Sequence, residues 1–457
     1  MKNDNPITFG EFLYKDIDNN EYLNELYRDI LFNYSIELFN INREKREIDI
    51  SSALRFADIL SKSVHKKRAD EHKIWAQQIV ALLHKIYPND YRIKHYVGSV
   101  LQNTGNFRGL NMINPEFKST ILLENLYAEF NKSYLSIPAE PEHYFFRSQK
   151  VVYDRLKDDY FSYSGPTSMG KSFVMRMFIK EQIIDGAQSN FAVIVPTKAL
   201  INEVSSRIIN DLKELLKEYN YRLITSAGAL SLKTEHNFIF ILTPERLLYL
   251  LIDNPSINIE YLFIDEAHKI SAKGSRSAFY YKVVDMLCRK SKKPHIIFAS
   301  PNIPNPEIYL NLIPEAYNVE KQKLTSSFAP VSQMKYLIDL PNYKIEIFNE
   351  NTKELIEVAK LKKKASISEL ITRLGGKGQN IIYCPGINKA INYALDFAED
   401  KEMKNTPELL TLAKDIENEV HRDYYLADLI PKGIAYHIGY LPSTIKMRIE
   451  DLYRQGL

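Results

Sequence analysis

The stretch from Gly165 to Ser172, which reads GPTSMGKS, constrains the fold of this chain more than any other part of its sequence. It matches the phosphate-loop pattern in full, and a helix-compatible segment, Phe173 to Ile184, follows it. In such loops the glycines let backbone N–H groups turn toward a β-phosphate, and the helix that follows adds its positive N-terminal end. We therefore expect a loop and helix that cradle phosphates. The alternative is an accidental Gly/Ser loop without a ligand.

The residues of this stretch have distinct expected roles. Lys171 would reach the β- and γ-phosphates of a nucleotide, and the Ser172 hydroxyl would be a ligand of Mg²⁺. ATP and Mg²⁺ are therefore the predicted cofactors. The residues predicted to bind the nucleotide are Gly165, Thr167, Ser168, Met169, Gly170, Lys171 and Ser172.

A second motif follows a short apolar run, Tyr261 to Ile264, which has the composition of a buried strand. The run ends in Asp265 and Glu266, so both carboxylates would lie at the carboxyl end of the strand. There Asp265 would hold Mg²⁺ through its water shell, and Glu266 would orient and deprotonate the water that attacks the γ-phosphate. The alternative is a solvated acidic pair at the end of a strand.

Short apolar runs separated by helical stretches continue on both sides of this motif. Runs of this kind are typical of fully buried parallel strands. Strands that alternate with helices predict a doubly wound α/β sheet, whose ligands lie at the carboxyl ends of the strands. The predicted strands are Phe191 to Val195, Phe238 to Leu242, Tyr261 to Ile264, Ile296 to Ala299 and Asn380 to Cys384.

The first part of the chain has a helical pattern instead. Leu23, Leu26 and Ile30 recur at spacings of three and four, and the same spacing returns in a segment that begins near Trp75. Pro88 would stop that second helix. We therefore expect antiparallel helical hairpins without a catalytic cluster in this region.

Composition excludes several classes of protein. The 60 Lys+Arg and 57 Asp+Glu residues leave a net charge of +3, too small for binding acidic partners through bulk charge. The two cysteines, Cys288 and Cys384, fit a reducing compartment. No run reaches the roughly 18 apolar residues of a membrane-spanning helix. We therefore expect a globular, cytoplasmic protein without a membrane partner.

With both motifs in place, the chain resembles the superfamily-two DEAD/DEAH-box helicases, and more closely their Ski-type branch. The segment from Pro196 to Leu200 is similar to the motif Ia of that family, and the segment from Thr243 to Arg246 is similar to its motif Ib/Ic. In the family both motifs touch the nucleic-acid backbone, which suits hydroxyls and a cation that contact phosphates. The resemblance thus implies nucleic-acid contacts from Thr197, Lys198, Thr243 and Arg246.

Further residues gain a role only through this resemblance. Gln149 precedes the phosphate loop as the adenine-reading glutamine of the family does; the alternative is a surface residue. His268 joins Lys171, Asp265 and Glu266 in the implied catalytic set. The segment from Gly433 to Pro442 and the helix behind it resemble the Ski-type element that contacts the tracking strand, which implies nucleic-acid contacts from His437 and Arg448. An ordinary, partly buried histidine is the alternative for His437.

The resemblance also predicts how the chain is divided. The expected parts are a helical N-terminal domain, a first RecA-like ATP-binding domain, a connecting segment, and the start of a second RecA-like domain. Two prolines make Ser136 to Pro141 the best candidate for a linker, and Gln333 to Val358 suggests a β-hairpin. The predicted boundaries are 1–135, 136–325, 326–370 and 371–457.

Two departures from the family bear on activity. The motif III of the family reads Ser-Ala-Thr, whereas here only Ser300 is retained, followed by Pro301 and Asn302. The sequence ends at Leu457 without the motif V and the arginine-bearing motif VI of the family. We therefore expect an ATP hydrolase of the helicase type whose 457-residue chain binds ATP and Mg²⁺ but shows little turnover by itself.

The helical start and the Ser300 segment resemble bacterial antiphage defence helicases of the Hachiman type. This resemblance implies nucleic acid as a partner, DNA in preference to RNA, and an effector nuclease as a second partner. The residues are compatible with two functions. One is an ATP-dependent helicase or translocase, and the other is an ATP-binding, nucleic-acid-sensing assembly module without unwinding activity that regulates a partner nuclease. Contacts to the backbone leave the bases unread, so neither the polymer nor the polarity follows from the residues.

Overall fold

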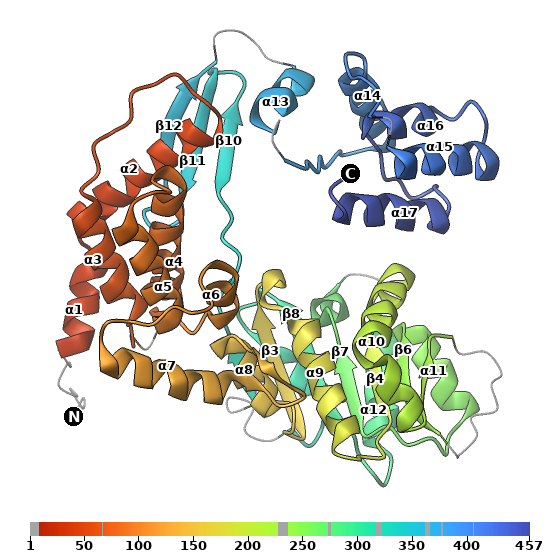
Figure 1. Ribbon diagram of the computed structural model, residues 1–457. Coiled ribbons are helices and arrows are strands. Elements are labelled where there is room, and N and C mark those ends of the chain that lie inside the picture. Colours follow the sequence, from red (N-terminus) through yellow and green to blue (C-terminus); the bar gives the residue numbers. More distant parts are fainter. Residues whose placement is uncertain are drawn as a thin grey trace. The chain divides into compact units, whose positions relative to one another are not determined.

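The computed structural model describes residues 9–65, 67–226, 236–272, 276–316, 322–361, 366–375, 378–404 and 406–457. The chain divides into two compact units, which Figure 1 shows as a ribbon. The first unit comprises Met1–Ile30 and Glu47–Gln333, and the second comprises Leu31–Arg46 and Met334–Leu457. The division predicted from the sequence into 1–135, 136–325, 326–370 and 371–457 stays a prediction.

The N-terminal region is helical, as predicted. Its α4 helix, Ala69–Ile86, ends two residues before Pro88, where the missing N–H and the ring of a proline stop a helix. Buried apolar side chains at helical spacing hold the region together, Trp75, Ile79 and Leu83 of α4 among them. The other helices of this region are α1 Phe9–Asp18, α2 Glu21–Leu38, α3 Ile50–Ser61, α5 Tyr91–Asn103, α6 Phe107–Ile113 and α7 Leu122–Leu135.

The linker predicted at Ser136 to Pro141 is wrong. The chain there forms a small antiparallel pair, β1 Ser136–Ile137 and β2 Glu140–Tyr144. Pro138 lies in the turn between the strands, and Pro141 lies in a strand with a single neighbour. A proline has no backbone N–H to donate. It is tolerated in a turn and in an edge strand, because the N–H is not needed there for hydrogen bonds to strands on both sides.

A seven-stranded sheet forms the centre of the first unit, and every neighbouring pair in it is parallel. The strand order is β5-β6-β4-β7-β8-β3-β9. The strands predicted near 191, 238, 261 and 296 are all present in it. The seven strands are β3 Tyr160–Gly165, β4 Phe191–Ile194, β5 Tyr221–Ile224, β6 Asn237–Leu242, β7 Tyr261–Ile264, β8 His295–Pro301 and β9 Lys323–Thr325.

Helices cover the sheet on both faces, so its strands are apolar throughout. One buried cluster joins strand residues to α8, α9 and α10, and a second joins the alternate strand residues to α11 and α12. This two-sided burial explains the unbroken apolar runs in the sequence. The doubly wound α/β sheet is therefore confirmed. The bounds are α8 Arg147–Arg155, α9 Lys171–Ile184, α10 Lys198–Glu218, α11 Pro244–Asp253, α12 Ser277–Cys288, and the 3-10 helices η1 Thr167–Met169, η2 Ala267–Ser271 and η3 Pro306–Leu312.

The second unit contains an antiparallel sheet of three strands, where the sequence predicted a two-stranded hairpin. Its strands are β10 Lys335–Asp339, β11 Lys344–Asn349 and β12 Glu354–Lys360. The segment Leu31–Arg46 packs with this sheet: Ser35 Oγ lies 2.9 Å from the Tyr336 hydroxyl, and Arg43 donates to the Val358 carbonyl at 2.8 Å. A two-stranded hairpin is marginal by itself, so a third strand and a helix end are needed to cover its apolar side.

Residues 366–375, 378–404 and 406–457 contain helices and irregular chain but no strand. The strand predicted at Asn380 to Cys384 is therefore wrong: Ile381 and Tyr383 are 81% and 94% exposed. A buried parallel strand needs a paired neighbour and covering helices, which the described residues around this run do not provide. A second RecA-like domain stays a prediction. The elements are α13 Ile367–Leu374, α14 Ile387–Ala398, α15 Pro407–Glu419, α16 Tyr425–Leu429, η4 Ile430–Lys432 and α17 Ser443–Arg454.

Among the residues that the structure describes, no helix is long and apolar enough to cross a membrane.

Candidate nucleotide-binding site

The phosphate-loop residues follow β3 at the carboxyl edge of the sheet. Gly165 ends that strand, Thr167, Ser168 and Met169 form η1, and Lys171 begins α9. Gly170 has φ of +80°, and a Cβ there would lie 2.8 Å from Gln149 Nε2, so a glycine is required at this position. The predicted loop and helix are therefore present, and a strand that was not predicted, β3, precedes them.

Met169 differs from the other loop residues because its side chain is buried in the core below the loop. It is 1% exposed and belongs to the apolar cluster under α8, α9 and α10. Only its backbone is thus left to face a ligand, whereas Thr167 is exposed.

Lys171 lies folded over the loop. Its ammonium nitrogen donates to the carbonyls of Gly165 and Pro166, both at 3.1 Å, and the residue is 5% exposed. Burial lowers the pKa of Lys171, and the charges of Asp265 and Glu266 oppose that shift. The ammonium group is therefore held at the loop by two neutral carbonyl oxygens. Phosphate oxygens of a bound nucleotide are charged and would form stronger hydrogen bonds with it.

Ser172 and Asp265 bring the two sequence motifs together. The Ser172 hydroxyl donates to Asp265 Oδ2 at 3.2 Å. Burial raises the pKa of Asp265, with the charge of Glu266 acting in the same direction and Lys171 against it. A hydroxyl beside one carboxylate fits Mg²⁺, which prefers oxygen ligands, uses one or two carboxylates and keeps several waters.

Glu266, directly after Asp265, has a strained backbone. Its φ is +53°, a left-handed value that is uncommon for a residue with a side chain, and its N–H donates to Asp265 Oδ1 at 2.9 Å. His268 Nδ1 lies 3.2 Å from Glu266 Oε2. Burial lowers the pKa of His268, which favours the neutral imidazole. The Glu266 carboxylate is thus only partly buried, and its role as a base stays a prediction.

Gln149 is a buried residue that braces the loop, and the surface alternative for it is wrong. Its Nε2 donates to the Met169 carbonyl at 2.7 Å, and its Oε1 accepts from the Phe146 N–H at 2.9 Å. These bonds join the first turn of α8 to the phosphate loop. Adenine recognition by Gln149 stays a prediction.

The segment that replaces motif III is bonded to the strand that enters the phosphate loop. The Asn302 N–H donates to the Gly165 carbonyl at 3.3 Å, and the Ile303 N–H donates to Ser164 Oγ at 2.7 Å. Asn302 has φ of +26°. The Gly165 carbonyl therefore accepts from both Lys171 and Asn302. Ser164 was not among the predicted site residues; in the sequence it is marked only as a hydroxyl residue directly before the loop.

The residues predicted to contact nucleic acid in the first unit lie at the starts of two helices. Thr197 caps α10 by accepting from the Leu200 N–H at 3.3 Å, and Thr243 caps α11. Lys198 is exposed at the first position of α10. Arg246 donates to the Thr225 carbonyl at 2.8 Å. The two threonines are thus helix caps first, and Lys198 is the residue of this set with a free approach to a phosphate.

Arg276 connects these two helix starts and was missed in the sequence. It donates to both carboxylate oxygens of Glu245 at 2.5 and 3.0 Å and to the Pro196 carbonyl at 2.9 Å. Burial alone would raise the pKa of Glu245, but the hydrogen bond from Arg276 is the main influence that lowers it to about 2. Arg276 therefore fixes the segment at Pro196 against the first turn of α11.

His437 and Arg448 belong to the second unit, where each has an acidic partner. His437 Nε2 lies 3.1 Å from Glu450 Oε1, and Arg448 forms an ion pair with Asp415. The His437 side chain is 48% exposed, so the alternative of an ordinary, partly buried histidine stays open. Nucleic-acid contacts from both residues stay predictions.

Comparisons with known proteins bear on this geometry. Residues 147–308 match the model of the DEAD/DEAH box helicase family. The matched range includes Gln149, the phosphate loop, Asp265 and the Ser300 segment.

Two curated relatives and one solved structure show what the chain is similar to. It is 22% identical over 381 residues to the Hachiman protein HamB of Bacillus cereus, which covers 74% of this chain and 32% of that protein. It is 25% identical over 321 residues to the human helicase POLQ-like, covering 65% of this chain and 28% of the relative. A structure of the DUF1998 helicase MrfA bound to DNA matches with a TM-score of 0.32 and 17% identity, covering 40% of this chain and 27% of that one. The chain thus spans about a third of the length of the curated relatives.

Proposed function

We propose that this chain is the ATP-binding part of an ATP-dependent nucleic-acid helicase or translocase that acts on DNA in bacterial antiphage defence. The observation that carries the proposal is the hydrogen bond between Ser172 and Asp265, because it joins the phosphate loop to the carboxylate that would hold Mg²⁺. A phosphate loop without that carboxylate would support nucleotide binding alone.

The residues around this bond suit hydrolysis of a γ-phosphate. Lys171 would leave the carbonyls of Gly165 and Pro166 and neutralise the β- and γ-phosphates. Mg²⁺, held by Ser172 and Asp265, would supply charge neutralisation on the phosphate oxygens. Glu266 would orient a water and accept its proton, since its carboxylate is beside the site and only partly buried.

Nucleic acid would be bound through its phosphates by the starts of α10 and α11. Lys198 provides an exposed cation, and the N-terminal N–H groups of both helices favour anions. Arg276 would act as a positioning residue because it holds the two segments together through Glu245 and Pro196. Contacts of this kind are independent of base sequence.

The role in defence, the preference for DNA, the cytoplasmic location and an effector nuclease partner rest on similarity. The support is the 22% identity to a protein named as a Hachiman component. No residue described above distinguishes DNA from RNA.

One observation favours a second candidate function, an ATP-binding module that senses nucleic acid and assembles with a partner without unwinding. The segment that replaces motif III is bonded back onto β3 through Asn302 and Ile303. Such a segment could report the state of the phosphate loop without driving strand separation.

Strand displacement separates the two functions. A fluorescent duplex with a single-stranded overhang would be incubated with the protein, with and without ATP, and with the Glu266→Gln variant as control. ATP-dependent displacement by the parent alone supports the helicase. ATP-dependent binding of the overhang without displacement supports the sensing module. A lack of any ATP effect on binding or displacement contradicts both.

A further inference from the structure

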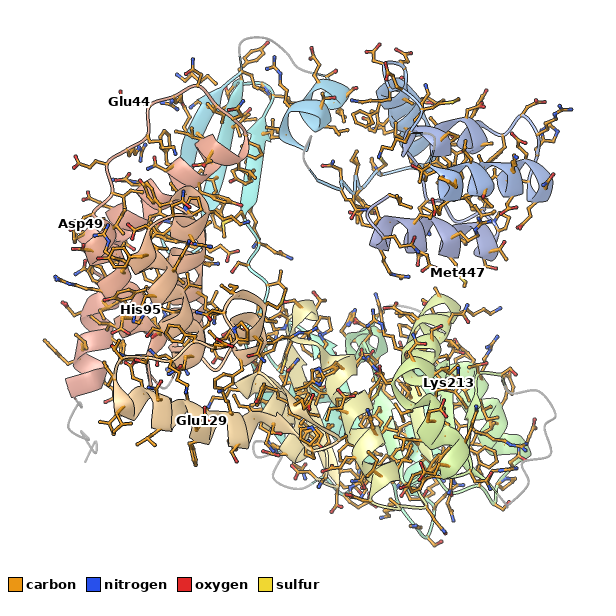
Figure 2. All side chains as sticks on the ribbon, viewed as in Figure 1. Glu44, Asp49, His95, Glu129, Lys213 and Met447 are labelled. Carbon is orange, nitrogen blue, oxygen red and sulfur yellow. The ribbon has the colours of Figure 1, made fainter. Side chains whose placement is uncertain are left out.

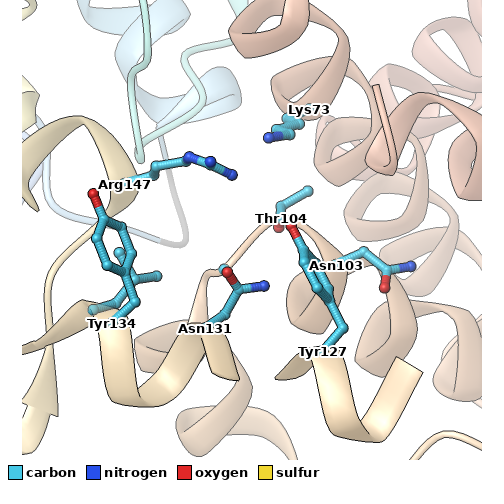
Figure 3. Close-up of a pocket in the computed structure, with 9 residues that line it drawn as sticks. Lys73, Asn103, Thr104, Tyr127, Asn131, Tyr134 and Arg147 are labelled. Carbon is cyan, nitrogen blue, oxygen red and sulfur yellow. The ribbon is translucent and has the colours of Figure 1, made fainter. Parts of the chain in front are cut away.

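We propose that a pocket between the helical region and the first turn of α8 binds a phosphoryl group, at a site separate from the phosphate loop. The pocket is formed by α4, the end of α5, α7 and α8, all in the first unit, and contains about 260 Å³ of space not filled by protein atoms, part of it open to solvent. Its enclosed part is small, so a ligand would lie at its mouth. Figure 3 shows the residues that line it.

Two cations dominate the pocket. Lys73 of α4 and Arg147 of α8 point toward one another in Figure 3. Among the described residues neither cation forms an ion pair within 4.0 Å, but the charges of both act on the carboxylate of Asp70, which also accepts from the Ser326 hydroxyl. One carboxylate near two cations leaves an excess of positive charge, which a bound anion would neutralise.

The protonation behaviour of Lys73 agrees with this arrangement. Burial lowers the pKa of Lys73, and the charge of Arg147 lowers it further, while Asp70 opposes both. A phosphate between the two cations would favour the charged ammonium.

Three uncharged residues of the pocket also have side chains that can donate hydrogen bonds. They are Tyr127, Asn131 and Tyr134, which recur at spacings of four and three and therefore lie on one face of α7. The Thr104 hydroxyl, by contrast, already donates to the Val100 carbonyl at 2.8 Å. Hydroxyl and amide groups donate to phosphate oxygens, and a guanidinium does so in a two-pronged geometry. Donors of both kinds around one open mouth fit a phosphoryl group better than a neutral or cationic ligand.

The pocket is distinct from the nucleotide site although the same turn of helix serves both. Arg147 and Gln149 are two residues apart on α8, about 200° around the helix axis, so they point to opposite sides. Gln149 is committed to Met169 of the phosphate loop. A ligand on Arg147 would therefore not replace a nucleotide on Lys171.

A phosphoryl group could come from two sources, a nucleic-acid backbone or a free phosphate or nucleotide. The test uses the full chain with the Lys171→Ala substitution as background, because this substitution weakens phosphate binding at the phosphate loop. Sodium phosphate and a single-stranded oligonucleotide without terminal phosphates are each titrated by calorimetry at constant ionic strength.

Three variants are compared in that background. Lys73→Met and Arg147→Gln each remove one pocket charge, and Lys132→Gln is the control, since it removes a charge from α7 that pairs with Glu129 outside the pocket. Because Arg147 is exposed, we expect Arg147→Gln to fold, and this variant tests the proposal if Lys73→Met fails to fold.

We expect each pocket variant to weaken binding about tenfold, with no change in the control. A loss seen with sodium phosphate alone assigns a free phosphate, and a loss that extends to the oligonucleotide assigns a backbone phosphate. Equal affinities of all three variants for both probes would overturn the proposal.

Discussion

The Ser172 hydroxyl donates to Asp265 Oδ2 across 3.2 Å, although the two residues are 93 positions apart in the sequence. They meet because β3 and β7 are separated by β8 alone, and parallel strands bring their carboxyl ends to the same edge of the sheet. A hydroxyl and a carboxylate are thus in place for Mg²⁺ without any rearrangement of the sheet.

Glu266→Gln should retain ATP but stop its hydrolysis. An amide has the shape of the carboxylate but cannot accept the proton of the attacking water, so we expect turnover to fall by a factor of about 100 or more. ATP affinity should stay within about twofold, since the phosphates are held elsewhere. Because little turnover is expected of the 457-residue chain by itself, phosphate release is measured in a full-length context, beside Glu218→Gln, an exposed control at the end of α10. Hydrolysis at the parent rate would exclude Glu266 as the base.

Ser164→Ala should loosen the segment that replaces motif III. The Ser164 hydroxyl accepts from the Ile303 N–H at 2.7 Å and is 1% exposed, so its loss should lower the free energy of unfolding by about 1 kcal/mol. Ser205→Ala is a matched control, because Ser205 is buried but its hydroxyl has no partner among the described residues. Chemical denaturation measures both, and equal changes would mean that the Ser164 bond contributes nothing.

Arg276→Gln should change how stability depends on pH. The folded-state pKa of Glu245, about 2, lies below the ordinary value of 4.5, so the contribution of the pair is present above pH 4.5 and is lost as the pH falls toward 2. The unfolding temperatures of parent and variant should therefore differ most near neutral pH and converge in acid. A difference that stays constant from about pH 6 to pH 3 would show that Arg276 acts through Pro196 rather than through Glu245.

Lys198→Gln should weaken nucleic-acid binding equally for all base sequences and reduce its salt dependence. A single phosphate contact contributes about 1 to the slope of log affinity against log salt, so the slope should fall by about that amount. Lys213→Gln removes the same charge from the exposed face of α10, about 22 Å further along the helix (Figure 2). Fluorescence anisotropy at several salt concentrations compares the two. Equal slopes in both variants would show that Lys198 makes no such contact.

Much of the first unit could be predicted, because buried parallel strands are apolar on both faces. Strand β3 was not among the predictions: it carries Ser162 and Ser164, which look exposed in the sequence. In the structure both are buried, because Ser162 donates to the Pro306 carbonyl at 2.6 Å and Ser164 accepts from Ile303. These partners lie 144 and 139 positions further along the chain, so no local pattern predicts them.

The opposite error occurred at Asn380 to Cys384. Its apolar residues resemble a buried strand, yet local composition cannot supply the neighbouring strand that burial requires. Within the site, motif spacing was enough to expect Lys171, Ser172 and Asp265 close together, and their roles stay predictions. Arg276 could not be predicted, because its partners Glu245 and Pro196 precede it by 31 and 80 residues.

Calorimetric titration of ATP, in the presence of Mg²⁺, into the parent chain and into Lys171→Ala tests the nucleotide site most directly. Lys213→Ala serves as a control for loss of charge. We expect saturable binding by the parent and by the control in the micromolar to millimolar range. Binding by Lys171→Ala should be weaker by a factor of about 10 or more, because the phosphates lose their cation. Equal affinities of the parent and of Lys171→Ala would contradict the assignment of Gly165–Ser172 as the ATP site.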